Sequence, residues 1–315
     1  YFINSDTKNI YKFMKNFLKK IYNFIPNNLK IFLFYIVKYF FKPNEKIFQH
    51  LHFRGYFKIK LFNKYAYMYS IGTILENTVF WKGIENAHEP LSNQIWFHLS
   101  KKSNLIIDVG VNVGLYSLIS HMANNKCKIH GFEPSRKFVF ALNKIKKKNN
   151  IDIEINSVAL GDSNDLVYFD GYRTATDLNE KKFYTNTINS KWKEVSQIKL
   201  SEYIIAKKIS KIDLIKMDIE KNEYKVIKDI KENIKKDQPN MLIEIINGDK
   251  FSQDRINNEI GLIIKNLNYK VYLIDDKNKI INISSSITYS TYWNVLFLNS
   301  DTSMSFEREF DSYIH

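Results

Sequence analysis

Short apolar runs separated by amphipathic segments are the feature that most restricts how this sequence can fold. The segments between the first five runs, such as Leu115–Ala123 and Ser135–Lys148, carry apolar residues at helical spacing. Strands that alternate with helices in this way predict α/β architecture: a mostly parallel sheet with helices on both faces. The seven runs are Leu105–Val109, Cys127–Phe132, Ile153–Val158, Ile212–Met217, Met241–Ile246, Tyr269–Ile274 and Trp293–Leu298.

The segments at either end of this pattern complete the predicted fold. No clear helix separates the last two runs, which predicts a terminal hairpin and one antiparallel strand. Ahead of the sheet, Tyr56–Leu61 and Tyr65–Ser70 alternate in polarity around an Asn63-Lys64 turn and predict a small β-hairpin. Thr78–Trp81 predicts a further short strand, and residues 90–102 predict a helix.

Positive charge is concentrated at the N-terminus. The 315 residues have a formal net charge of +14. Residues 1–60 contain twelve Lys or Arg and two acids, or +10, which leaves +4 for the other 255 residues. An enzyme acting on nucleic acid usually spreads basic charge over its active face, so nucleic acid is not the expected partner. We divide the chain into a basic, aromatic helical arm (1–46), a β-hairpin with a lead-in helix (47–102), the main α/β domain (103–300) and a C-terminal tail (301–315).

The arm predicts two helices on either side of Pro26. Residues 8–25 place four lysines on one face, whereas residues 29–41 are almost entirely apolar. The uninterrupted run Ile31–Val37 is far shorter than the roughly 20 residues of a membrane span, and no small-residue cleavage site follows it, so a signal peptide is not expected. Two interpretations stay open: a helical cap on the domain, or an interfacial anchor in which residues 8–42 bind an anionic membrane surface.

The only cysteine, Cys127, bears on both location and chemistry. One cysteine excludes a disulfide framework and a cysteine-based zinc cluster. The cytoplasm is therefore the expected location, with peripheral association at the inner membrane face if the arm is an anchor. Cys127 falls at the start of a predicted buried strand, which argues against a role as the nucleophile that carbon methylation of a pyrimidine requires.

A glycine-containing bend follows the first strand of the main domain. Gly110 and Gly114 allow the backbone to approach a ligand, and the next helix directs its N-terminal N–H groups at the same space. The G-x-x-x-G spacing differs from the G-x-G-x-x-G of dinucleotide sites. The next strand ends at Glu133, which is placed to accept hydrogen bonds from ribose hydroxyls. Together with Asp108, these residues fit an adenosine ligand with a carboxylate tail and no phosphate, which describes S-adenosylmethionine.

Five segments extend this pattern through the domain: IDVGVNVGLYSL (Ile107–Leu118), GFEP (Gly131–Pro134), ALGD (Ala159–Asp162), IDLIKMDIE (Ile212–Glu220) and LIEI (Leu242–Ile245). In order and spacing they resemble the FkbM-type S-adenosylmethionine-dependent methyltransferases over roughly residues 75–250. The resemblance implies a seven-stranded, Rossmann-like class I methyltransferase fold and O-methylation, often of a sugar or polyketide hydroxyl. It also implies contacts from Asp108, Gly110, Asn112 and Gly114 to the methionine end of the cofactor, from Glu133 to the ribose, and from the segment between Ala159 and Asp162 near the adenine.

The sequence departs from the family pattern at three positions. Val111 replaces the usual Ala, Lys221 stands where Gly is usual, and Ser201 stands where an Asp is common. The last two follow or flank the fourth strand rather than the glycine bend. They therefore bear on the identity of the substrate more than on cofactor binding.

Methyl transfer to an alcohol benefits from a base at the carboxyl edge of the sheet, because the hydroxyl loses its proton during attack. Asp218 is the first candidate, followed by Glu220 and His88. Further side chains are candidates for contact with the substrate: Glu89, Glu244 and Trp192, the last with Tyr172 and Tyr184 in a polar, aromatic stretch. The spacing of the acids does not require Mg²⁺, so no metal is predicted.

The chemical class of the methyl acceptor can be narrowed by elimination. Methylation of a base amino group typically uses an Asn/Asp-Pro-Pro-aromatic turn after the fourth strand, and no proline follows Asp218 until Pro239. An oxygen acceptor is the best remaining fit. We predict an O-methyltransferase acting on a small-molecule or glycan acceptor in glycolipid or polysaccharide biosynthesis. Two alternatives stay open: an RNA 2′-O-methyltransferase that uses the arm to hold RNA, and a non-enzymatic, membrane-associated binding protein on a methyltransferase fold.

Overall fold

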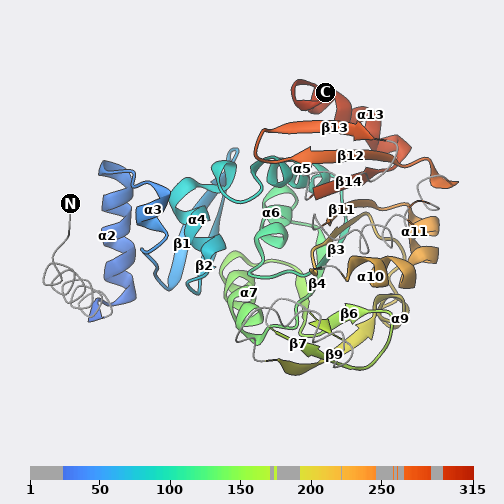
Figure 1. The fold of residues 1–315 in the computed structure, drawn as a ribbon, viewed down its shortest axis with the longest axis horizontal. Coiled ribbons are helices and arrows are strands. Elements are labelled where there is room, and N and C mark those ends of the chain that lie inside the picture. The colour runs from blue at the N-terminus through green and yellow to red at the C-terminus, as the bar shows by residue number, and fades with distance from the viewer. Residues whose placement is uncertain are drawn as a thin grey trace, which may run out of the picture.

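A single eight-stranded sheet organises the chain (Figure 1). The computed structural model describes residues 24–170, 174–175, 192–220, 222–245, 258, 261, 266–284 and 294–315. In spatial order the strands are β13 (Ile280–Ser284), β12 (Lys270–Asp275), β14 (Asn294–Leu298), β11 (Asn240–Glu244), β10 (Leu214–Met217), β3 (Leu105–Val109), β4 (Lys128–Phe132) and β5 (Ile153–Asn156).

The strand directions confirm the predicted fold. From β5 to β11 every neighbouring pair is parallel, and β14 lies antiparallel between β11 and β12. All seven predicted runs are strands of this sheet, as expected for a class I methyltransferase fold. The eighth strand, β13, was not predicted. It is a short edge strand paired only with β12, and Ile283 within it is 53 % exposed, so its pattern lacks the apolar continuity of the central strands.

Alternate residues of the central strands enter two separate cores. Ile106 of β3 packs with α5 (Pro90–Ser100), α6 (Leu115–Ala123) and α7 (Arg136–Asn149). Ile107 enters the opposite core with α9 (Leu200–Ala206), α10 (Glu223–Asp229) and α11 (Lys231–Asp237). Because both faces are buried, these strands are apolar throughout rather than alternating. The predicted tail contains α13 (Ser300–Glu309), which joins the first core through Phe306.

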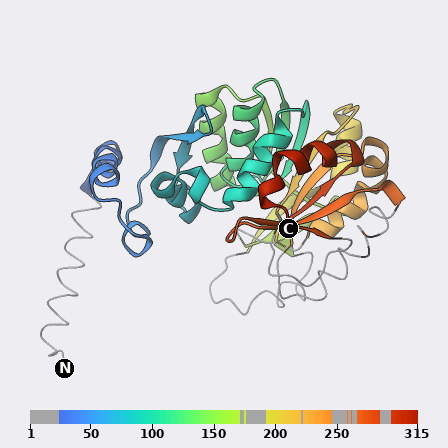
Figure 2. The ribbon, with the colours of Figure 1, turned by 90° about the horizontal axis from the view of Figure 1, so that it is seen from above.

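The N-terminal unit lies beside α6 and α7 and places α2 at the far end of the molecule (Figures 1 and 2). It consists of α2 (Asn27–Phe40), α3 (Glu45–Phe48), β1 (Gly55–Leu61), β2 (Lys64–Ser70) and α4 (Ile74–Lys82). The predicted hairpin is confirmed, although Leu61 pairs with Lys64 and the turn is Phe62-Asn63. The predicted strand over Thr78–Trp81 is wrong, because these residues lie in α4. A buried apolar run of this length has the same pattern in a helix and in a strand.

Hydrogen bonds and aromatic contacts hold this unit together and attach it to the sheet domain. The Asn149 side chain at the end of α7 pairs with both backbone groups of Tyr67 in β2, each at 2.7 Å. Phe34 of α2 packs against Trp81 of α4, with ring centroids 5.5 Å apart. The predicted helix over residues 29–41 is therefore present as α2, whereas the predicted helix over residues 8–25 lies largely outside the described residues.

A small second sheet stands over the carboxyl edge of the main one. Its strands are β6 (Ala159–Gly161), β9 (Lys193–Lys199), β7 (Leu166–Phe169) and β8 (Thr174–Ala175). It was not predicted, since its strands are short and two of them are separated by a long connection. Within the described segments, no helix is both long enough and apolar enough to cross a bilayer.

Candidate active site

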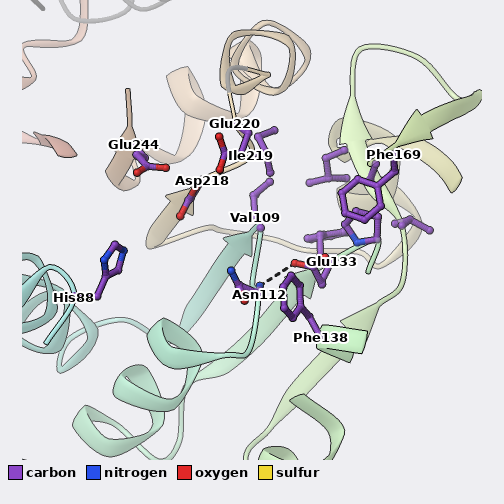
Figure 3. A pocket seen from close by; sticks show the side chains of 16 residues that line it. His88, Val109, Asn112, Glu133, Phe138, Phe169, Asp218, Ile219, Glu220 and Glu244 are labelled. Carbon is purple, nitrogen blue, oxygen red and sulfur yellow. Dashed lines mark hydrogen bonds between the residues drawn. The ribbon is translucent and has the colours of Figure 1, made fainter. Parts of the chain in front are cut away.

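A cavity of about 280 Å³ opens at the carboxyl ends of β3, β4 and β10 (Figure 3). Eight of the residues predicted from sequence line it: His88, Gly110, Asn112, Glu133, Ala159, Asp218, Glu220 and Glu244. Figure 3 shows Glu133, Phe138 and Phe169 on one side of the cavity and Asp218, Glu244 and His88 on the other. The cavity therefore has an aromatic end and an end rich in titratable groups.

The glycine bend forms the floor between these ends. The N–H groups of Gly110 and Val111 both donate to the carbonyl of Phe132, at 3.0 and 3.1 Å, which ties the bend to β4. Gly110 has φ +81°, and a Cβ on it would overlap the carbonyl oxygen of Asp218. Gly114 has φ +85°, and a Cβ there would lie 2.5 Å from Cδ1 of Leu142. Glycine is required at Gly110, because the neighbouring atom is backbone, and it is favoured at Gly114 by the left-handed conformation of the chain.

Glu133 is fixed at the aromatic end by two backbone donors. The N–H of Asn112 donates to its Oε2 at 2.9 Å, and the N–H of Ser135 donates to its Oε1 at 2.8 Å. The residue is only 5 % exposed, and this burial raises the pKa of its carboxyl to about 7. Each carboxylate oxygen can accept more than one hydrogen bond, so Glu133 can also accept from hydroxyl groups in the cavity.

Asp108 lies behind the bend rather than on the cavity wall. The Ser117 hydroxyl in the first turns of α6 donates to its Oδ2 at 2.6 Å, and burial raises the pKa of the carboxyl to about 6. This contact fixes α6 relative to the end of β3. Gly114 and Asp162, two other predicted cofactor contacts, are likewise not among the cavity-lining residues, and Asp162 is exposed.

At the opposite end, a buried lysine organises two carboxyl groups. Lys216 is 1 % exposed, and its Nζ lies 3.8 Å from Oδ2 of Asp218 and 4.9 Å from the centre of the Tyr116 ring. Burial alone would lower the pKa of Lys216, but the nearby carboxylates, Asp218 first among them, raise it overall. Lys216 is a charged residue inside the apolar run Ile212–Met217, and the sequence suggests it only as a partner for a buried carboxyl group, not as a site residue.

The two carboxyl groups differ in protonation. Burial would raise the pKa of Asp218, but the positive charge of Lys216 and the hydrogen bond from Glu244, with smaller contributions beside them, together lower the pKa. Burial, together with a hydrogen bond to Asp218, raises the pKa of Glu244 to about 11. At neutral pH Glu244 is therefore protonated and donates to an ionised Asp218. Asp218 is the member of the pair that can accept a proton from a ligand.

The segment before α5 closes this end of the cavity. Glu89 has a left-handed backbone with φ +52°; its Oε2 accepts from the Tyr116 hydroxyl at 2.6 Å and its Oε1 from the Asn294 amide at 2.8 Å. These contacts hold the Glu89 side chain outside the lining of the cavity. Nε2 of His88 lies 3.6 Å from Oε1 of Glu89, and the His88 ring faces the cavity (Figure 3).

The remaining predicted residues have varied positions. Glu220 lines the cavity with φ +56°, so both it and Asn112, with φ +53°, hold left-handed conformations at the site. Trp192 is partly buried and does not line the cavity. Ser201 donates through its N–H and its hydroxyl to Asp229, at 2.8 and 2.6 Å, so it links α9 to α10. Tyr172, Tyr184 and Lys221 lie outside the described residues.

Several cavity residues were not singled out from sequence. They are mostly apolar: Val109, Phe132, Pro134, Phe138, Val158, Leu160, Phe169 and Ile219. Phe169 reaches the cavity only through the small second sheet, so no local pattern could have identified it. In the described part of the chain, no cluster of three His, Cys, Asp or Glu side chains has the geometry to hold a metal ion.

The chain is similar to known methyltransferases in sequence and in structure. The profile of the Methyltransferase FkbM domain matches residues 108–272, more than half of the chain. The curated 31-O-demethyl-FK506 methyltransferase FkbM of Streptomyces tacrolimicus is 21 % identical over 154 residues, which are 40 % of this chain and 59 % of that protein. This chain therefore matches less than two thirds of that relative's length.

Solved structures with similar folds include methyltransferase FkbM from Methylobacillus flagellatus, with a TM-score of 0.41 and 14 % identity over 62 % of this chain and 43 % of that one. Another is the O-methyltransferase from Bacillus cereus in complex with SAH, with a TM-score of 0.40 and 12 % identity over 66 % and 80 % of the two chains.

Proposed function

Because this chain belongs to the FkbM methyltransferase family, we propose that it transfers a methyl group to a hydroxyl oxygen of a carbohydrate or glycolipid precursor. Its methyl donor is S-adenosylmethionine. The observation that carries the proposal is the pairing of a glycine-floored, aromatic end of the cavity with an ionised Asp218 at the other end. The aromatic end suits the nucleoside of the donor, and the ionised Asp218 suits proton removal from an alcohol.

The residues at the aromatic end fit the donor. Glu133 is placed to accept hydrogen bonds from the ribose hydroxyls, with Phe138 and Phe169 as apolar walls for the adenine. The bend at Gly110 and Asn112 would hold the methionine end, because both residues line the cavity between Glu133 and Asp218. When bound, the donor supplies an activated methyl group on a sulfonium centre.

At the titratable end, Asp218 acts as the base. The acceptor oxygen attacks the methyl carbon as the bond from that carbon to sulfur breaks, with its electron pair left on sulfur. The hydroxyl proton passes to Asp218, so the acceptor becomes a neutral methyl ether. Protonated Glu244 orients Asp218, and Lys216 keeps it ionised. Positioning of the acceptor oxygen about 3 Å from the methyl carbon supplies much of the rate increase.

Two features support a hydroxyl acceptor. The name of the Streptomyces tacrolimicus relative describes that protein as a methyltransferase for 31-O-demethyl-FK506, which is O-methylation. In this chain the end of the cavity facing Asp218 is lined by His88, Glu220 and Glu244, which suit a polar, hydroxyl-bearing molecule better than an apolar one.

The proposal predicts methylation of glycans by the purified protein. With S-adenosylmethionine labelled in its methyl group, we expect label in the lipid-linked and free oligosaccharide fractions of a cell extract, and a mass increase of one methyl group per product. Total RNA and water-soluble small molecules from the same cells form parallel arms. Label in RNA alone would instead favour the 2′-O-methyltransferase alternative. Donor binding without label in any arm would favour the non-enzymatic binding protein.

We further propose that α2 holds the enzyme at an anionic membrane surface. The outer face of α2 and its end expose large aromatic side chains: Phe32 (61 %), Tyr39 (77 %), Phe40 (70 %) and Phe41 (75 %). The lysines of α2 are directed inward, since Lys30 is buried and Lys38 donates to the carbonyl of Phe80. A helix with its apolar side outward, next to exposed Lys42 and Lys46, suits an interface of lipid headgroups.

This surface can be tested by flotation with vesicles of phosphatidylcholine alone or mixed with phosphatidylglycerol. We expect the wild type to float with the anionic vesicles. The double variant Phe32→Ser/Phe40→Ser should bind at least about tenfold more weakly, because burial of one large apolar side chain stabilises by about 1.5–3 kcal/mol. Ile205→Ser on α9, a residue that is 75 % exposed, is the matched control and should bind as the wild type does. Equal flotation of wild type and double variant would disprove the anchor.

A further inference from the structure

A second, larger cavity adjoins the active site. It has a volume of about 750 Å³ and lies between the N-terminal unit and the start of α7. His88, Asn112 and Phe138 line both cavities, so the two cavities meet along these three residues. We refer to this second cavity as the α4 groove, because residues 72–75 and 78 at the start of α4 form one of its walls.

Polar and apolar groups alternate along the α4 groove. Thr73 is the N-cap of α4, and its hydroxyl oxygen is buried from solvent, caps nothing and has no hydrogen-bond partner within the described chain. An N-cap threonine normally accepts from the helix N-terminus, so this hydroxyl is a buried, unsatisfied polar group behind the wall of the groove. Ile74, next to it, is 80 % exposed, and Leu75 and Phe138 extend the apolar surface.

The charges in the groove are nearly balanced. Lys82 pairs with Glu45 at 2.9 Å, and Lys137 at the start of α7 is the one other Lys or Arg among the described lining residues. A groove that binds nucleic acid gains most of its affinity from cations that neutralise phosphates. Pairing of Lys82 with an acid makes this groove unsuited to a phosphate backbone. A wall that combines hydrogen-bonding groups with apolar side chains suits a sugar ring, which presents both hydroxyl groups and C–H faces.

We propose that the α4 groove is the acceptor site and that it binds an oligosaccharide, whose terminal sugar passes His88 to present a hydroxyl to Asp218. This inference rests on the proposed function. The donor fits the smaller cavity, so the acceptor must arrive from another side, and the α4 groove shares His88 with the Asp218 end of that cavity. Its volume falls in the range of about 300–1,000 Å³ typical of ligand pockets.

The two walls of the α4 groove are held in a fixed relation. One wall belongs to the N-terminal unit and the other to α7, and these are joined by the paired hydrogen bonds between Tyr67 and Asn149. The Tyr56 hydroxyl also donates to the carbonyl of Lys144, at 3.3 Å. Such a preformed site avoids part of the ordering cost of binding. The N-terminal unit then serves acceptor recognition, a role separate from donor binding.

The test uses two variants that leave the donor cavity intact. Thr78→Trp fills the groove from a partly exposed position on α4, whereas Thr73→Val removes a buried hydroxyl with little change of shape and is the conservative control. Ile205→Trp on α9 is the control for an added surface tryptophan. Initial rates are measured against the concentration of the oligosaccharide fraction that accepts label, and S-adenosylhomocysteine affinity is measured by calorimetry.

We expect Thr78→Trp to raise the KM for the oligosaccharide at least about tenfold, whereas Thr73→Val should leave the KM near that of the wild type, because its hydroxyl is buried. Affinity for S-adenosylhomocysteine should stay within about twofold of the wild type in both, which also shows that the variants fold. A wild-type KM in Thr78→Trp would overturn the assignment of the groove while leaving the methyltransferase proposal intact. Weakened S-adenosylhomocysteine binding in Thr78→Trp would assign the groove to the donor instead. Failure of the wild type to methylate any oligosaccharide would refute the proposed function itself.

Discussion

Replacement of Asp218 by asparagine is expected to lower the rate of methyl transfer by about 10²–10⁴, the usual contribution of a positioned base. Asparagine keeps the shape of the side chain and removes its ability to take the hydroxyl proton. S-adenosylhomocysteine affinity should change little, because the contacts that fix the Glu133 end of the cavity do not involve the Asp218 side chain. Rates of label transfer to the oligosaccharide fraction and calorimetry with S-adenosylhomocysteine measure the two effects separately.

Glu244 provides a matched comparison. Since Glu244 is protonated and donates to Asp218, glutamine can make the same hydrogen bond. Glu244→Gln should therefore keep the rate within a few-fold of the wild type, although it removes a carboxyl group from the same cavity. The opposite result, with Glu244→Gln inactive and Asp218→Asn active, would make Glu244 the base and would contradict the protonation states inferred from the structure.

The loss in Asp218→Asn should not be a loss of folding. Removal of one partner of a buried ion pair usually destabilises by about 3–5 kcal/mol, because the other charge is left uncompensated. Here Glu244 lies close enough to contribute to the pKa of Lys216, and it can release its proton once Asp218 is gone. The charge of Lys216 would then be balanced by Glu244. We expect a thermal unfolding midpoint only modestly below that of the wild type, which distinguishes a chemical defect from a structural one.

The sheet and the glycine bend could be predicted because their signals are local. Each of the seven apolar runs is a strand of the sheet, the central ones are buried on both faces, and helical spacing marks α6 and α7. Gly110, Glu133 and Asp218 follow directly from strand ends, since parallel strands bring their carboxyl ends to one edge. Eight predicted site residues therefore meet in one cavity although up to 156 positions, from His88 to Glu244, separate them.

What could not be predicted depends on contacts between distant segments. Thr78–Trp81 is helical because Phe80 and Trp81 pack against Phe34 and Phe53, which no pattern of four apolar residues reveals. Phe169 reaches the site through a sheet whose strands pair across a long connection. The proton on Glu244 depends on the burial of Glu244 itself and on its hydrogen bond to Asp218, so identical residues in a solvated loop would carry different charges.

Gly110→Ala is expected to abolish donor binding, with a loss of at least about a hundredfold in S-adenosylhomocysteine affinity, or about 2.7 kcal/mol. The added Cβ would overlap the backbone oxygen of Asp218, and backbone cannot move aside as a flexible side chain can. The end of β3 must therefore separate from the end of β10. That displacement alters the floor of the cavity and the position of the base together, so methyl transfer should fall along with affinity. Calorimetry with S-adenosylhomocysteine is the direct measurement.

Gly83→Ala isolates the cause of that loss. Gly83 has φ +76°, close to the +81° of Gly110, but a Cβ there would meet no atom within 4 Å. Both substitutions place alanine at a positive φ that L side chains rarely adopt, and only Gly110→Ala adds the overlap with Asp218. Gly83→Ala should therefore lower the unfolding midpoint yet bind S-adenosylhomocysteine normally. If Gly110→Ala also bound S-adenosylhomocysteine with wild-type affinity, the bend would not form the donor site. A cavity with Gly110 in its floor could not keep its shape once the ends of β3 and β10 are forced apart.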